Sequence, residues 1–99
     1  PANRTPARRE RFGRLIQHQG HAKVWRILMD GRVDATYKLI ADRTGLKLNT
    51  VKNYRSQLLT ELRVHGLHDP TLRDMQNFAC RCRAFLRPYV DAALGTPQA

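Results

Sequence analysis

The sequence has few acidic side chains and no long apolar run. Eight Asp and Glu residues stand against 18 Lys and Arg among 99 residues, which gives a formal net charge of +10. No segment approaches the roughly 20 apolar residues that span a bilayer, and no secretory signal pattern is visible. We expect no membrane partner. The basic excess favours a polyanion, with nucleic acid ahead of an acidic membrane surface, over a charge that serves solubility alone.

Cysteine and histidine are also sparse, and their spacing offers little for metal chemistry. Cys80 and Cys82 lie two apart in a predicted helix, so their side chains point to different faces and do not readily share one metal ion. The histidines form two pairs, His18 with His21 and His65 with His68. A zinc site built from these pairs is conceivable, but the tight ligand spacing of common zinc sites is missing. Two reduced thiols fit a cytoplasmic protein.

Catalytic patterns are missing as well. The sequence has no Gly-rich phosphate loop and no recognisable local motif that joins Ser, His and Asp, and its acids fall at helix caps and turns. We therefore expect neither an enzyme nor a cofactor, and no metal.

The spacing of apolar residues predicts an all-α, compact domain of about five helices. We expect a flexible arm over residues 1–6, a single helical domain over 7–94 and a frayed tail over 95–99. The first helix, over 7–18, is amphipathic with a weak point at Gly13. The second covers 22–29 and ends at the turn signature Asp30-Gly31.

Two further helices follow a turn and make up the most informative part of the chain. The first is predicted over 35–44, with Asp34 as its N-cap and Gly45 closing it in a left-handed conformation. The second is predicted over about 49–64 and stops at Gly66.

The residue types around this turn are those that a helix-turn-helix requires. The small side chain of Ala41 lets the helices approach closely, Gly45 makes the turn, and Val51 fills the crevice between the helices. The remaining inward contacts are expected from Ile40, Leu46, Tyr54 and Leu58.

The stretch GLKLNTVKNYRSQLLTEL resembles the recognition half of LuxR-type regulators and of the related sigma-factor region 4. The shared features are the run Thr50-Val51-Lys52 and an aliphatic stretch that ends in Leu62. The resemblance covers about a third of the chain, residues 36–62, and implies that Thr50 and Lys52 approach the phosphate backbone and the major groove. The chain departs from the family at Lys47, where a Ser or Thr cap is usual, and at Tyr54, where His is common.

Polar side chains on the outer face of the 49–64 helix are the candidate DNA contacts. Those with amide or guanidinium groups that can pair with base edges are Asn49, Asn53, Arg55 and Gln57. The candidate phosphate contacts are Lys47, Thr50 and Lys52, with Lys38 and Arg43 from the preceding helix. Ser56 lies on the same face. The alternative is a solvated polar surface, which is equally acceptable for Gln57 or Ser56 alone.

A cluster of arginines near the amino terminus has two interpretations. It comprises Arg4, Arg8, Arg9, Arg11 and Arg14. The cluster is either an arm that enters the minor groove or follows phosphates, or the solvent side of the first helix.

The last helix is predicted over 70–94, after Asp69-Pro70, with a kink or an interruption at Pro88. Its apolar residues recur in alternating steps of three and four, as in a coiled-coil seam. The predicted seam comprises Leu72, Met75, Phe78, Ala79, Cys82, Phe85, Leu86, Tyr89 and Ala93. It favours a homodimer, which would read two half-sites, and the alternative is domain core.

These patterns together predict a sequence-specific regulator of transcription that binds double-stranded DNA, of bacterial, phage or plasmid type. Such a protein would be cytoplasmic and associated with the nucleoid. Three alternatives remain open: an adaptor or antiactivator that binds another regulator, a sigma-like module that binds RNA polymerase, and the DNA-targeting domain of a recombinase or transposase.

Overall fold

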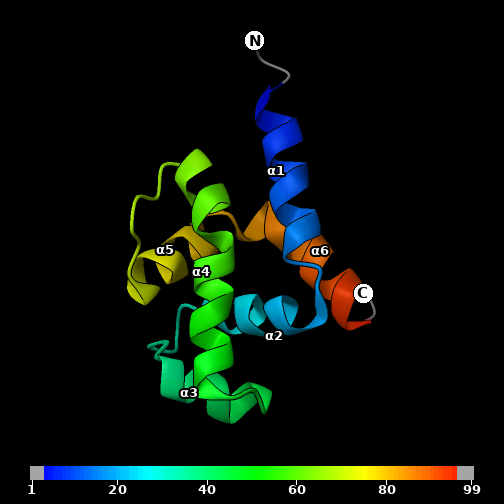
Figure 1. Cartoon of the computed structure of the whole chain (residues 1–99). Helices are drawn as coiled ribbons and strands as arrows, with labels where there is room; N and C mark the ends of the chain where they lie inside the picture. Colours follow the sequence, from blue (N-terminus) through cyan, green and yellow to red (C-terminus); the bar gives the residue numbers. More distant parts are fainter. Residues whose placement is uncertain (1–3, 96–99) are drawn as a thin grey trace.

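The computed structural model describes residues 4–95, which fold into six helices (Figure 1). The helices are α1 (Arg4–Leu15), α2 (Gln19–Leu28), α3 (Tyr37–Thr44), α4 (Leu48–Val64), α5 (Leu72–Arg81) and α6 (Arg83–Leu94). Strands are absent from this part of the chain, so the all-α prediction is confirmed, with six helices in place of about five.

The amino-terminal helix starts earlier than predicted. Because α1 begins at Arg4, the prediction of a flexible arm is wrong for residues 4–6, and residues 1–3 lie outside the described range. Pro6 falls in the first turn, where backbone N–H groups have no acceptor within the helix, so a proline there costs little. At the other end Gly95 caps α6 in a left-handed conformation, and the predicted tail beyond it lies outside the described residues.

Gly13 is a close-approach site rather than a weak point of α1. It is buried, and a Cβ atom at this position would lie 2.5 Å from the ring of Tyr89 on α6. The absence of a side chain therefore lets α1 and α6 pack closely together.

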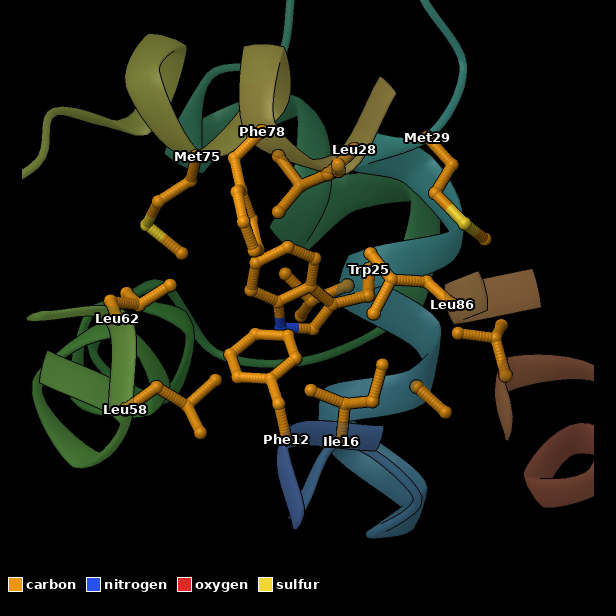
Figure 2. Packing of buried hydrophobic residues seen from close by; sticks show 14 of the residues in the cluster. Phe12, Ile16, Trp25, Leu28, Met29, Leu58, Leu62, Met75, Phe78 and Leu86 are labelled. Atoms are coloured by element: carbon orange, nitrogen blue, oxygen red, sulfur yellow. The ribbon is translucent and has the colours of Figure 1, made fainter. Parts of the chain in front are cut away.

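The core is centred on Trp25 of α2. Its ring lies edge-on to Phe12 of α1 and Phe78 of α5, with centroids 5.3 and 6.3 Å away (Figure 2). Aliphatic residues from α4 and α6, among them Leu62 and Leu86, surround these rings and are fully buried. Residues from every helix thus enter one core, and α2 packs against α3, α5 and α6.

The predicted last helix is two helices, α5 and α6, joined at Cys82. Thr71 and Asp74 form a capping box at the start of α5, and Cys82 ends that helix with φ −101°. A kink or an interruption was predicted at Pro88, and the interruption is wrong because Pro88 lies inside α6. Pro88 and Ala84, four residues before it, are both exposed, so water can bind the carbonyl group that a proline leaves without a donor.

Gln76 of α5 holds the loop that leads from α2 into α3. Its side chain is buried, and its Nε2 donates hydrogen bonds to the carbonyl oxygens of Asp30 and Val33, at 3.2 and 2.5 Å. The Oε1 atom accepts a hydrogen bond from the Ala35 N–H at 3.3 Å. One side chain therefore binds three backbone groups of this loop, which has no regular structure of its own.

Candidate nucleic-acid interface

Helices α3 and α4 are joined by a three-residue turn at residues 45–47. Gly45 has φ 74° and ψ 8°, and its N–H donates to the carbonyl oxygen of Ala41 at 3.0 Å. This left-handed cap was predicted and is confirmed. The N-cap of α3 is Thr36, whose side chain accepts a hydrogen bond from the Leu39 N–H at 3.1 Å. The prediction of Asp34 as N-cap is wrong, because α3 begins two residues later than expected.

The packing between the two helices follows the predicted pattern. Ile40, Val51 and Leu58 are buried, and Ala41 and Tyr54 are partly buried against the same core.

The carboxyl end of α4 has a predicted glycine stop, which is also confirmed. Gly66 has φ 89°, and the N–H groups of Gly66 and Leu67 donate to the carbonyl oxygens of Arg63 and Leu62. These two bonds form a Schellman motif, so the carboxyl end of α4 is fixed by local geometry.

One face of α4 is exposed along the whole helix. Its members recur in steps of three and four, so they lie within about 100° of one another around the helix axis. We call this face the α4 stripe, and it comprises Asn49, Lys52, Asn53, Ser56, Thr60 and Arg63. It contains no carboxylate. Glu61, the one acidic residue of α4, lies on another side, where its side chain is only 12% exposed and pairs with Arg11 of α1 at 3.0 Å.

Basic residues lie at the amino-terminal end of α4 and on the neighbouring helix α3. Lys47 is the N-cap of α4, and its side chain makes no capping hydrogen bond. The Lys52 ammonium lies 5.8 Å from the centroid of the Tyr37 ring of α3, which orients the charge. Lys38 and Arg43 are exposed on α3, which lies beside this end of α4 (Figure 1). Thr50 is half-buried. The other predicted DNA contacts at this end of α4 are exposed, and they are Lys47, Asn49, Lys52, Asn53 and Ser56.

Arg55 does not belong to the exposed stripe, which corrects its prediction as a reader of base edges. Its Nε donates to the carbonyl oxygen of Pro70 at 2.8 Å, and its Nη2 lies 3.2 Å from the Asp69 carboxylate. The side chain is 23% exposed. The guanidinium is occupied because the loop after α4 folds back along the helix, an arrangement that helical periodicity does not reveal.

The side chain of Gln57 contacts His21, a residue that the sequence suggested only as a conceivable zinc ligand. His21 of α2 is 6% exposed, its Nε2 lies 3.1 Å from Gln57 Oε1, and its ring centroid lies 4.2 Å from that of Tyr54. The Nδ1 atom is buried without a hydrogen-bond partner. Burial lowers the pKa of His21 and the charge of His18 adds to this, while the Gln57 hydrogen bond acts in the opposite direction.

His65, at the carboxyl end of α4, is also partly buried. Its ring centroid lies 5.2 Å from that of Phe12 and 5.6 Å from that of Phe78. Burial lowers the pKa of His65, and the nearby charge of Glu61 partly offsets that effect. Among the described residues, no three His, Cys, Asp or Glu side chains are grouped as metal ligands.

The arginine cluster is on a packed helix and not on an arm. The Arg9 guanidinium lies 5.3 Å from the centroid of the Phe85 ring of α6, and Arg11 pairs with Glu61 of α4. Arg14 pairs with Glu10 at 2.5 Å, and Arg8 is exposed. The predicted arm is therefore wrong for Arg8, Arg9 and Arg11, because apolar residues of the same helix enter the core. Arg4 lies in α1, but its side chain is outside the described part of the structure.

The apolar seam on α5 and α6 faces the core of its own chain. Four of the predicted dimer residues are at most 5% exposed, and they are Met75, Phe78, Ala79 and Leu86. The other five are partly buried against the same core, and they are Leu72, Cys82, Phe85, Tyr89 and Ala93. The prediction of a dimer interface from this seam is therefore wrong. Spacing in steps of three and four identifies an apolar face, but it does not distinguish a partner in the same chain from one in a second copy.

Comparison with protein-family models, with curated proteins and with solved structures gave no match to this chain. None of the described helices combines the length and the apolar character needed to cross a membrane.

Proposed function

We propose that this chain is a sequence-specific regulator of transcription that inserts the α4 stripe into the major groove of double-stranded DNA. The observation that supports this most directly is the stripe itself, which is exposed, polar and free of carboxylates on a helix that follows a three-residue turn. A major groove about 12 Å wide accepts one α-helix, and the first four turns of α4 extend about 20 Å.

Two amides on the stripe suit the reading of base edges. Asn49 and Asn53 are exposed and one helical turn apart, so both can face the floor of the same groove. An asparagine amide pairs with the N6 and N7 atoms of adenine. We assign these two residues to base contacts in place of Arg55.

The basic residues around them suit contacts with phosphates. Lys47 and Lys52 lie at the amino-terminal end of α4, where helix N–H groups also favour an anion, and Lys38 and Arg43 are exposed on α3, which packs against α4. Such contacts place a helix in register without selecting a sequence. The proposal requires no second copy of the chain.

The test is selection of duplexes from a random library by the purified chain, followed by titration with fluorescence anisotropy. Asn53→Ala should weaken binding by about 1–3 kcal/mol and relax the preference at one base pair. Lys52→Ala should weaken binding to every duplex and lower the slope of log K against log salt by about 1. Lys23→Ala, which removes an exposed charge from α2, is the matched control and should change neither.

The proposal is rejected if the library yields no preferred sequence and Lys52→Ala behaves like Lys23→Ala. Binding to RNA polymerase or another protein that is lost on Lys52→Ala, with no duplex binding, would instead favour the adaptor or sigma-like interpretation.

A further inference from the structure

A buried histidine of α2 binds a side chain at the edge of the α4 stripe. Gln57 lies one helical turn after Asn53 and about 40° further around the axis of α4, and it is exposed. The Nε2 atom of His21 lies 3.1 Å from Gln57 Oε1. Within residues 4–95 the Gln57 side chain forms no other hydrogen bond, so its nitrogen is available to a partner outside the chain.

Packing fixes the position of the His21 ring. Its centroid lies 4.2 Å from that of Tyr54, which is three residues before Gln57 and further from the stripe. The neighbouring Gly20 has no side chain, and a Cβ atom there would collide with Tyr54. Since only 6% of His21 is exposed, the ring has little room to move, and it approaches Gln57 from the side away from the stripe.

The protonation of the His21 ring determines which end of the Gln57 amide it binds. Burial lowers the pKa of His21, so the ring is neutral at pH 7.5 and carries a single N–H. The Nδ1 atom is buried without a partner, and a proton there would be a buried donor with no acceptor. A proton on Nε2 instead donates to Gln57 Oε1, so Nε2 carries the proton.

This hydrogen bond sets the orientation of the Gln57 amide. An unrestrained glutamine can turn either its oxygen or its nitrogen toward a base edge. With Oε1 turned toward His21, the end that remains for DNA is Nε2, which is a donor. Guanine, thymine and adenine each present an acceptor in the major groove, whereas cytosine presents the N4 donor. An amide held in this orientation therefore discriminates against cytosine.

We propose that His21 is a positioning residue that holds the Gln57 amide with its nitrogen toward the DNA, so that α4 rejects cytosine at one position of its site. This inference rests on the proposed function and adds a specificity to it. The base concerned should lie one or two steps from the base that Asn53 contacts, because the two residues are about 6 Å apart along α4 and stacked base pairs about 3.4 Å apart.

The test begins with selection of duplexes by Gln57→Ala, which should lose its preference at this one position and thereby identify it. Two duplexes are then compared, with a G·C pair at that position in either orientation and the rest of the selected site unchanged. The parent should bind the orientation that places cytosine opposite Gln57 about two- to tenfold more weakly than the reverse, as one net hydrogen bond would give.

Two variants change the donor in different ways. His21→Phe keeps an aromatic ring beside Tyr54 but has no N–H, so it should reduce the ratio between the two duplexes to less than about twofold. Gln57→Glu can still accept from His21 with one oxygen, and it offers DNA an acceptor with the other, so it should favour cytosine instead. His68→Phe, at an exposed position after α4, is the matched control and should keep the ratio of the parent.

A double-mutant cycle separates positioning from a general effect on the fold. In the Gln57→Ala background, His21→Phe should leave the ratio unchanged, because His21 acts only through Gln57. Circular dichroism and Trp25 fluorescence verify that each variant is folded. Equal affinity of the parent for both duplexes, or an unchanged ratio in the single variant His21→Phe, would overturn the inference alone. A parent that selects no preferred sequence would overturn the proposed function together with it.

The position of the proton is measured in the parent chain, without any substitution. Long-range proton–nitrogen NMR correlations of the His21 ring at pH 7.5 should show Nε2 protonated and Nδ1 bare. A proton on Nδ1 would overturn the inference even if His21→Phe did not fold.

Discussion

Replacement of Gln76 by leucine tests whether one buried amide holds the loop before α3. Leucine has a similar size and fills the space, but it binds none of the three backbone groups that Gln76 contacts. Each net hydrogen bond of this kind contributes about 1 kcal/mol, and a buried group that is left without a partner costs about 1–3 kcal/mol. Partial access of water to the loop limits the penalty, so Gln76→Leu should lower the free energy of unfolding by about 2–3 kcal/mol.

Urea unfolding followed by Trp25 fluorescence measures this change, because the single tryptophan is buried in the core. For a domain of this size the expected loss corresponds to a fall in Tm of about 8–20 °C. The matched control is Asn77→Leu, which alters the exposed neighbour on the same helix and should change stability by no more than about 0.5 kcal/mol.

Amide hydrogen exchange locates the effect within the molecule. In Gln76→Leu the Ala35 N–H should exchange faster than expected from global unfolding alone, because it loses its acceptor. A variant as stable as the parent, with normal protection at Ala35, would show that the loop is held by other contacts.

Three further predictions address other contacts. Gly13→Ala should destabilise the fold by about 1–3 kcal/mol, because the added Cβ would collide with the Tyr89 ring of α6. Thermal unfolding measures this change, and a more stable variant, as the helix propensity of alanine alone would give, would refute the close approach. Arg55→Ala should lower the free energy of unfolding by about 1 kcal/mol, because the contacts with Pro70 and Asp69 are lost. It should reduce duplex affinity less than Lys52→Ala does, and equal losses in anisotropy titrations would indicate that Arg55 contacts DNA. Burial lowers the pKa values of His21 and His65 in the folded state, so the unfolded chain binds more protons at acidic pH. The free energy of unfolding should therefore be highest above pH 6.5 and should fall as the pH drops below that value. His21→Gln should flatten this dependence in urea titrations at pH 7 and pH 5, while His68→Gln, at an exposed position, should leave it unchanged.

Local signals explain which parts of the fold could be predicted. Gly45 and Gly66 end helices because a left-handed backbone favours glycine, and this preference is local to each position. The apolar period of α4 likewise identified its buried side, and Val51 and Leu58 are in the core as expected. Such features depend on neighbours in the sequence.

The errors concern contacts between distant parts of the chain. Asp69 and Pro70 lie 14 and 15 residues after Arg55, and no periodicity indicates that their loop folds back onto that guanidinium. The break at Cys82 has no glycine or proline to mark it, and it lets α5 and α6 each direct an apolar side to the core. A buried residue such as Gln76 was not identified because its three partners lie more than 40 positions away.

The central position of α2 has a consequence for how the chain acquires its structure during synthesis. This helix packs against α3, and also against α5 and α6, which come more than 40 residues later in the chain. Until α5 and α6 have left the ribosome, the part of the apolar surface of α2 that they cover remains exposed. A ribosome-bound fragment that ends at residue 67 should therefore be cut readily by protease.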